Sequence, residues 1–145
     1  MLTIRPAAGS DRAFWFSLDA HLPEAMFSRK IREGEALVAE EDGRPVAILR
    51  WSFFWDEIPF CNLLYVVRDR QRCGIGRTLL TAWERNMRAA GYDRILVSTQ
   101  ANEEGQHFYR KLGYRDCGAL LLTPGDPTEL FFVKELDSQN SEVRP

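Results

Sequence analysis

The stretch Gln71-Arg72-Cys73-Gly74-Ile75-Gly76 decides the fold, because it joins an apolar strand to an amphipathic helix. The residues before it, Cys61–Val67, are almost continuously apolar, which predicts a central strand. The residues after it repeat apolar side chains at helical spacing as far as Gly91, which predicts a helix that ends there. The repeating side chains are Leu79, Leu80, Trp83 and Met87.

This glycine-rich loop has the chemistry of an anion site. Gly74 and Gly76 allow a tight turn and a close approach of the backbone to a ligand. The first N–H groups of a helix lack internal partners and lie at the positive end of its dipole, where a phosphate can bind. Residues 68–77 hold four arginines and one acid, a local excess of +3 in a chain of net charge −2. The contrast suits an anionic ligand.

Two common nucleotide motifs do not match this loop. The dinucleotide fingerprint requires a third glycine where Leu79 stands, and the P-loop requires a lysine that the loop lacks. Taken alone, the loop fits an anion site and an ordinary strand-to-helix turn with solvated arginines equally well.

The rest of the chain alternates strands and helices. Leu2–Arg5 reads as a first strand, Ser10 or Asp11 as the cap of a helix, and Pro23 as the start of a second helix. Asp42-Gly43 marks a hairpin turn between strands at residues 36–40 and 45–51.

After the loop and its helix, residues 94–99 form a further strand and Asn102 caps a helix that runs to Gly113. Residues 118–122 and 129–136 are the last two strands. Because strands and helices alternate in the middle of the chain, part of the sheet is expected to be parallel.

Length and composition restrict the class of protein. The 145 residues, 45% hydrophobic and 28% charged, predict one soluble domain over residues 1–136 with a flexible tail at 137–145. The negative net charge argues against a nucleic-acid binder, and no apolar run is long enough to span a membrane. The N-terminus shows no signal peptide, and the three scattered cysteines fit neither a disulfide framework nor a metal site. A cytoplasmic protein is expected.

A second segment, Asn102–Tyr114, turns these features into a family resemblance. Gln71–Gly76 resembles the [RQ]-x-x-G-x-[GA] motif of the GCN5-related N-acetyltransferases (GNAT), and Asn102–Tyr114 resembles their N-x-x-[AG]-x-x-x-Y-x-x-x-G-[FY] motif. Gly105 stands where alanine is frequent, which leaves room for the cofactor. The resemblance implies an α/β fold with a mixed, partly parallel central sheet of six to seven strands flanked by four helices.

The resemblance also implies a site for acetyl-CoA as co-substrate, without a metal. The loop N–H groups would hold the pyrophosphate, a bulge near Leu64–Val66 would bind the pantetheine arm and point one N–H at the thioester carbonyl, and Asn102 would bond the pantetheine. The cofactor-binding residues so implied are Leu64, Tyr65, Val66, Gln71, Arg72, Cys73, Gly74, Ile75, Gly76, Arg77 and Asn102. Tyr109 would be the general acid.

The base and the acceptor remain open. Glu57 precedes the central strand and is a candidate general base, with a water chain as the alternative. The acceptor is expected to be a primary amine on a small molecule or peptide. The aromatic cluster Trp51, Phe53, Phe54 and Trp55 predicts either core or interface packing or an apolar acceptor pocket with Trp15 or Phe27 on the facing helices. The acids Asp19, Glu24, Asp56 and Glu57 could attract the amine there, but a solvated face explains them as well. The apolar stretches 120–122 and 131–133 suit a homodimer or a core equally. A non-catalytic acyl-CoA-binding or interaction module is the alternative function.

Overall fold

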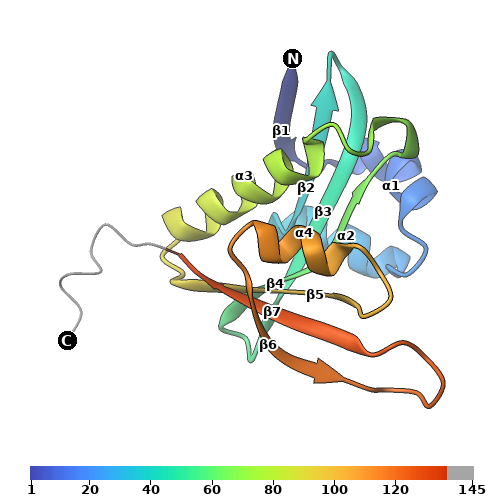
Figure 1. Cartoon of the computed structure of the whole chain (residues 1–145). Coiled ribbons are helices and arrows are strands. Elements are labelled where there is room, and N and C mark those ends of the chain that lie inside the picture. The colour runs from blue at the N-terminus through green and yellow to red at the C-terminus, as the bar shows by residue number, and fades with distance from the viewer. Residues whose placement is uncertain (137–145) are drawn as a thin grey trace. The chain divides into compact units, whose positions relative to one another are not determined.

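The computed structural model describes residues 1–136, and its element order is the one expected from the sequence (Figure 1). The predicted tail 137–145 lies outside the described residues. The elements are β1 (Leu2–Pro6), α1 (Arg12–Leu18), α2 (Glu24–Glu33), β2 (Ala36–Glu41), β3 (Arg44–Phe54), β4 (Ile58–Val66), α3 (Ile75–Ala89), β5 (Arg94–Gln100), α4 (Gly105–Lys111), β6 (Arg115–Leu120) and β7 (Glu129–Glu135), with 3-10 turns at Gly9–Asp11 and Arg68–Arg70.

The described strands form one seven-stranded sheet in the order β1-β2-β3-β4-β5-β7-β6. β4 pairs in parallel with β5 at Phe60 and Cys61, whereas β1 with β2, β2 with β3, β5 with β7 and β6 with β7 are antiparallel. The expected mixed, partly parallel sheet is therefore confirmed. β4 is central, as predicted, but it begins at Ile58, earlier than the sequence pattern indicated.

The residues fall into two compact units, the first made of Met1–Ser52 and Asn62–Trp83. Its core is aromatic: Trp15 of α1 and Phe27 of α2 are buried with their ring centroids 5.8 Å apart. The β2–β3 turn has positive φ at both Asp42 (51°) and Gly43 (82°), as a two-residue hairpin requires. The predicted hairpin is therefore confirmed.

The start of α1 agrees with the prediction in position only. Asp11 occupies the N-cap position of α1, as predicted, but its side chain makes no cap hydrogen bond to the helix. Its carboxylate instead accepts the Ala8 N–H at 2.7 Å and two hydrogen bonds from Arg5, at 2.7 and 2.8 Å. Asp11 therefore ties β1 to the 3-10 turn before the helix, because its carboxylate bonds to the charged Arg5 guanidinium six residues earlier instead of to the helix N–H groups.

The second unit consists of Phe53–Cys61 and, among the described residues, 84–136. The long antiparallel pairing of β5 with β7, from Arg94 opposite Glu135 to Gln100 opposite Glu129, forms its frame. Phe132 on β7 and Ile95 and Val97 on β5 are completely buried. β6 lies at the edge of the sheet with all of its residues exposed, and it ends at Leu120 rather than at residue 122.

Candidate functional site

The backbone before α3 is shaped to leave N–H groups unpaired. Gly74 has φ of 84° and Arg72 has φ of 63°, a left-handed value that a non-glycine residue rarely adopts. Within the described part of the chain, the N–H groups of residues 72–77 donate to no backbone carbonyl, whereas those of Gln71 and Thr78 bond to Arg68 and Gly74. Ile75 is buried and anchors the start of the 15-residue helix. The loop therefore presents a run of free donors at the positive end of α3.

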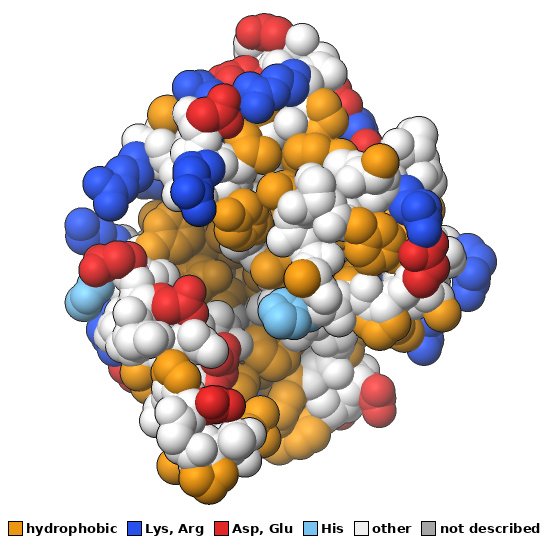
Figure 2. All heavy atoms as spheres, turned by 90° about the vertical axis from the view of Figure 1, so that its right-hand side faces the viewer, with side chains coloured by type: hydrophobic (Ala, Val, Ile, Leu, Met, Phe, Trp, Pro, Cys, Tyr) orange, Lys and Arg blue, Asp and Glu red, His pale blue; other side chains and the backbone are white. Residues whose placement is uncertain are grey.

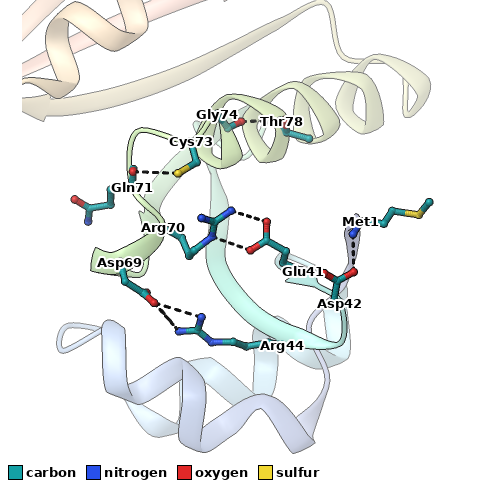
Figure 3. Close-up of polar contacts among 10 residues, drawn as sticks. All are labelled: Met1, Glu41, Asp42, Arg44, Asp69, Arg70, Gln71, Cys73, Gly74 and Thr78. Atoms are coloured by element: carbon teal, nitrogen blue, oxygen red, sulfur yellow. Dashed lines mark hydrogen bonds and ion pairs between the residues drawn. The ribbon is translucent and has the colours of Figure 1, made fainter.

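Side-chain contacts hold this loop from the β2–β3 hairpin (Figure 3). Arg70 makes two hydrogen bonds of 2.7 Å to the Glu41 carboxylate, which raise the pKa of the Arg70 guanidinium, and Arg44 lies 3.4 Å from Asp69. Sequence reasoning missed Glu41 and Arg44, and the only signal for them was their charge beside the Asp-Gly turn.

The loop stays cationic when these partners are counted. Five arginines (residues 44, 68, 70, 72 and 77) against Glu41 and Asp69 leave a net charge of +3. No ion pair among residues 1–136 engages Arg68, Arg72 or Arg77. Gln71 donates its side-chain amide to the Val66 carbonyl at 2.9 Å, and the exposed Cys73 thiol donates to the Gln71 carbonyl at 3.5 Å. These contacts stabilise the loop without occupying its backbone N–H groups.

The end of β4, where pantetheine contacts were expected, is half-buried. Leu64, Tyr65 and Val66 are all of intermediate exposure, and the Tyr65 ring packs against the core of the first unit. The bulge predicted near Leu64–Val66 stays a prediction.

The predicted helix cap at Asn102 is wrong, because α4 begins three residues later. The helix begins at Gly105 with Glu104 in the cap position, so Asn102 is not the cap and lies exposed in the preceding turn. Gln106 donates its side-chain amide to the carbonyls of Ala101 (2.6 Å) and Glu103 (3.1 Å), and the Glu103 carboxylate accepts the Gln100 N–H at 3.3 Å. These local side-chain contacts close the turn that a cap at Asn102 would have closed.

Gly105 is explained by a neighbouring side chain. A Cβ at position 105 would lie 2.7 Å from Thr99 Oγ1 and 3.3 Å from Thr99 Cβ. Glycine at position 105 therefore avoids a clash with Thr99 on β5. The family resemblance implied a different reason, namely that glycine leaves room for the cofactor.

Tyr109 is buried at 7% exposure within an aromatic cluster. Its ring centroid lies 5.4 Å from that of Phe108, 5.5 Å from that of Tyr114 and 6.0 Å from that of Phe132. Burial raises the pKa of the Tyr109 phenol far above its ordinary value, and the nearby Cys61, Glu103 and Glu129 raise it further. Tyr109 therefore keeps its proton at every physiological pH, as a proton donor must.

Glu57 lies at the turn between β3 and β4. The turn has positive φ at Trp55 (57°) and Asp56 (59°), and the Glu57 N–H donates to the Phe54 carbonyl at 3.1 Å. The Glu57 side chain is exposed. Glu57 immediately precedes the first residue of β4, whereas Leu64–Val66 are its last residues.

Several residues expected near an acceptor pocket are engaged in the core or in ion pairs, whereas Asp56 and Glu57 are exposed. Trp15 and Phe27 are core residues, so the pocket predicted around them is wrong. Asp19 is buried, accepts hydrogen bonds from Arg50 (2.8 Å) and Trp15 (3.0 Å), and therefore attracts no substrate amine. Burial alone would raise the pKa of Asp19, but Arg50 and the His21 N–H lower it below its ordinary value.

Other conspicuous groups lie at the surface. Glu24 forms an exposed ion pair with Arg12, and the side chains of His21 and His107 are exposed.

Figure 2 shows one face of the molecule, on which acidic, basic and hydrophobic side chains are interspersed. Over the described residues, no group of three or more His, Cys, Asp or Glu side chains is arranged to hold a metal ion, and no helix is long and apolar enough to cross a membrane.

These features define an α/β fold with free backbone donors and an excess of positive charge at the N-terminus of a helix. A family model described as an acetyltransferase (GNAT) domain matches residues 32–116, which is more than half of the chain. The chain belongs to the GNAT acetyltransferase family. A search of curated protein sequences finds no match.

Solved structures share the fold over almost the whole chain. Ard1 from Thermoplasma volcanium superposes with a TM-score of 0.84 at 16% identity, covering 94% of this chain and 99% of that one. The ribosomal-protein-S18-alanine N-acetyltransferase from Escherichia coli gives 0.79 at 18% identity with full coverage of both chains. A GNAT acetyltransferase from Elizabethkingia anophelis with acetyl-CoA bound gives 0.74 at 18%, covering 93% and 98%. At these identities the likeness establishes the fold.

Proposed function

We propose that the chain transfers an acetyl group from acetyl-CoA to a primary amine of a small molecule or peptide by direct attack. The observation that carries the proposal is the run of free N–H groups at residues 72–77, in a loop of net charge +3 with positive φ at Arg72 and Gly74. Acetyl-CoA is the anion that its family uses, and the structure of the Elizabethkingia relative contains it.

The residues present fit a pyrophosphate. Two linked phosphates need several donors at once, and the loop offers consecutive N–H groups together with the unpaired side chains of Arg72 and Arg77. Leu64, Tyr65, Val66 and Asn102 would hold the pantetheine arm, and a backbone N–H near Val66 would stabilise the oxyanion. Acetyl-CoA supplies an activated acyl group as a thioester.

Tyr109 would donate the proton that the departing sulfur needs. The amine nitrogen bonds to the thioester carbon, the C–S bond breaks, and its electron pair on sulfur takes the phenolic proton. An ordinary thiol has a pKa near 8.5 and an ordinary phenol one near 10, so donation is uphill in water. Burial raises the pKa of Tyr109 further, but a thiolate that leaves in the same dry surroundings is destabilised as well, which offsets part of the difference.

The amine must lose a proton before it attacks. For a lysine-like amine of pKa about 10.4, deprotonation at pH 7 costs roughly 4.6 kcal/mol. Glu57 is exposed and precedes the first residue of β4, whereas the proposed thioester site lies at its last residues, so we favour the open alternative, a relay of water molecules. The ammonium gives its first proton to solvent before the attack. Once the N–C bond has formed, the nitrogen loses its second proton, which the relay returns to the Tyr109 phenolate. Glu57 stays a candidate base.

The acceptor class is the least constrained part of the proposal. The Escherichia coli relative acts on an alanine of ribosomal protein S18, so N-terminal peptide amines belong in the first screen together with small amines. We place the protein in the cytoplasm, where acetyl-CoA is made available, and a homodimer through its exposed edge strand β6 is compatible with this activity.

The test is a screen of peptide and small-molecule amines for release of free coenzyme A from acetyl-CoA. The proposal expects at least one amine to increase thiol release above the rate without amine, with an acetylated amine detected by mass spectrometry. If acetyl-CoA binds but no amine in a broad panel is acetylated, the chain acts as an acyl-CoA-binding module instead.

A further inference from the structure

The C-terminal end of α4 is held unusually tightly, beginning with its backbone. The Tyr114 N–H donates to the Tyr109 carbonyl at 3.1 Å, and the Gly113 N–H donates to the Arg110 carbonyl at 3.2 Å. Gly113 has φ of 91°, so these contacts form a Schellman motif. Its usual apolar contact is present, since the rings of Tyr109 and Tyr114 meet edge to face at 5.5 Å. Tyr114 therefore holds both the backbone and the ring of Tyr109.

Tyr114 is in turn held by a buried carboxylate. Its hydroxyl donates to Glu84 Oε2 at 2.7 Å, and Glu84 on α3 is 7% exposed. Burial raises the pKa of Tyr114 and the Glu84 carboxylate adds to the effect, so the phenol remains a donor.

Lys134 on β7 contacts both Glu84 and the C-terminal end of α4. Its ammonium group donates to Glu84 Oε1 at 3.1 Å and to the Leu112 carbonyl at 2.8 Å. That carbonyl lies in the last turn of α4, where it lacks a helical partner. The Lys134 ammonium also lies 5.3 Å from the centroid of the Tyr114 ring. The Lys134 ammonium group therefore donates to the carbonyl at the helix end, pairs with the Glu84 carboxylate and lies near the Tyr114 ring.

We propose that Glu84 and Lys134 are positioning residues for Tyr109, which they hold in place through Tyr114 and the end of α4. The inference rests on the proposed role of Tyr109 as general acid. Neither side chain belongs to the segments that resemble the family motifs. Proton transfer requires hydrogen-bond geometry, and a misplacement of about 1 Å can cost a hundredfold in rate.

The test uses Lys134→Met and the milder Tyr114→Phe, which removes only the hydroxyl and keeps the ring against Tyr109. With acetyl-CoA and the best amine of the screen, we expect kcat to fall about tenfold in Lys134→Met and about threefold in Tyr114→Phe, with the KM for acetyl-CoA within about twofold of wild type. Lys134→Arg should recover most of the loss. Arg115→Gln, which breaks an exposed pair with Glu135 between β6 and β7, is the matched control and should leave kcat unchanged.

The deciding measurement combines each variant with Tyr109→Phe. If Lys134 and Tyr114 act through Tyr109, Lys134→Met and Tyr114→Phe cause no further loss of kcat once the Tyr109 hydroxyl is gone. Unchanged kcat in both single variants, or losses that multiply in the combined variants, would overturn the positioning role and leave the proposed function standing. If Tyr109→Phe alone has wild-type kcat, Tyr109 is not the general acid, and the positioning role of Glu84 and Lys134 is then excluded as well.

Discussion

The two helices that follow β4 and β5 begin in opposite ways. α3 starts after a loop with positive φ at Arg72 and Gly74, five nearby arginines and N–H groups that no backbone carbonyl accepts. α4 starts after a turn that Gln106 and Glu103 close with their own side chains, and its first residue is fitted against Thr99. The comparison shows that only the start of α3 combines the two properties that an anion site needs, free N–H donors and surrounding positive charge.

The largest effect is expected from a substitution in the loop at the start of α3, and it is a loss of acetyl-CoA affinity. In Gly74→Glu, a carboxylate would stand among the free N–H groups, and like-charge contact with pyrophosphate costs several kcal/mol, so we expect acetyl-CoA affinity to fall about a thousandfold. A Cβ at position 74 meets no atom within 4 Å, but φ of +84° strains any side chain there, so the backbone strain must be separated from the charge effect by a control.

Isothermal titration calorimetry measures this loss. The matched control is Gly34→Glu, which places the same side chain on another positive-φ glycine (70°) with open space around it, at the end of α2. Wild-type affinity in Gly74→Glu would refute the pyrophosphate assignment, and an equal loss in both variants would point to general destabilisation.

The second effect concerns the chemistry carried by α4. Tyr109→Phe removes the proton donor but keeps the aromatic cluster, so we expect about a hundredfold lower kcat with acetyl-CoA affinity unchanged. Tyr92→Phe is the matched control, because Tyr92 also packs against an aromatic ring, with its centroid 5.5 Å from that of Phe53. A steady-state assay of thiol release that gives equal kcat for both variants would remove Tyr109 from the mechanism.

The pH dependence of the reaction rate follows from the burial of Tyr109. A phenol whose pKa is raised in the folded state stays protonated through its ordinary pKa, so Tyr109 should cause no loss of rate up to about pH 10. The rate should rise with pH as the amine loses its proton and then level off. An alkaline decrease below pH 9 that disappears in Tyr109→Phe would contradict this, and kcat/KM measured across pH 6–10 decides it.

Smaller effects test the closed start of α4. Gly105→Ala improves helix propensity by about 1 kcal/mol, yet its methyl group would clash with Thr99, so we expect a net loss of about 1 kcal/mol in unfolding free energy. In a Thr99→Ala background the same change should be neutral or stabilising. Urea denaturation of the four proteins gives the coupling, and an equal loss in both backgrounds would mean that Thr99 is not the reason for Gly105.

The smallest effect concerns Glu57. Because its side chain is exposed at the opposite end of β4, Glu57→Gln should change kcat/KM by less than about threefold at any pH. A loss of a hundredfold, confined to low pH where the amine is charged, would establish Glu57 as the base and remove the water relay.

The order of elements was predictable from the sequence, because apolar periodicity and glycine turns act locally. The Asp42-Gly43 hairpin, the central β4 and the Gly91 helix end all follow from such local rules. The cap at Asn102 was wrong, since Gln106 bonds the carbonyls of the turn instead. Asp11 occupies the predicted cap position of α1, but its carboxylate bonds to Arg5 rather than to the helix.

The site was predictable only where its chemistry is in the backbone. The loop before α3 carries its signal in two glycines and several arginines, whereas the contacts of Glu84 and Lys134 join residues 50 positions apart in the chain. The pocket predicted around Trp15 and Phe27 was wrong because an aromatic residue on a helix has the same pattern whether it lines a cavity or fills a core.

The most direct test of the account follows the backbone amides themselves. Addition of coenzyme A to uniformly ¹⁵N-labelled protein should shift the N–H resonances of residues 72–77 downfield, as new hydrogen bonds form, with much smaller changes at residues 103–107. Shifts that are as large at 103–107 as at 72–77, or that leave 72–77 unmoved, would contradict the claim that the open start of α3 holds the pyrophosphate.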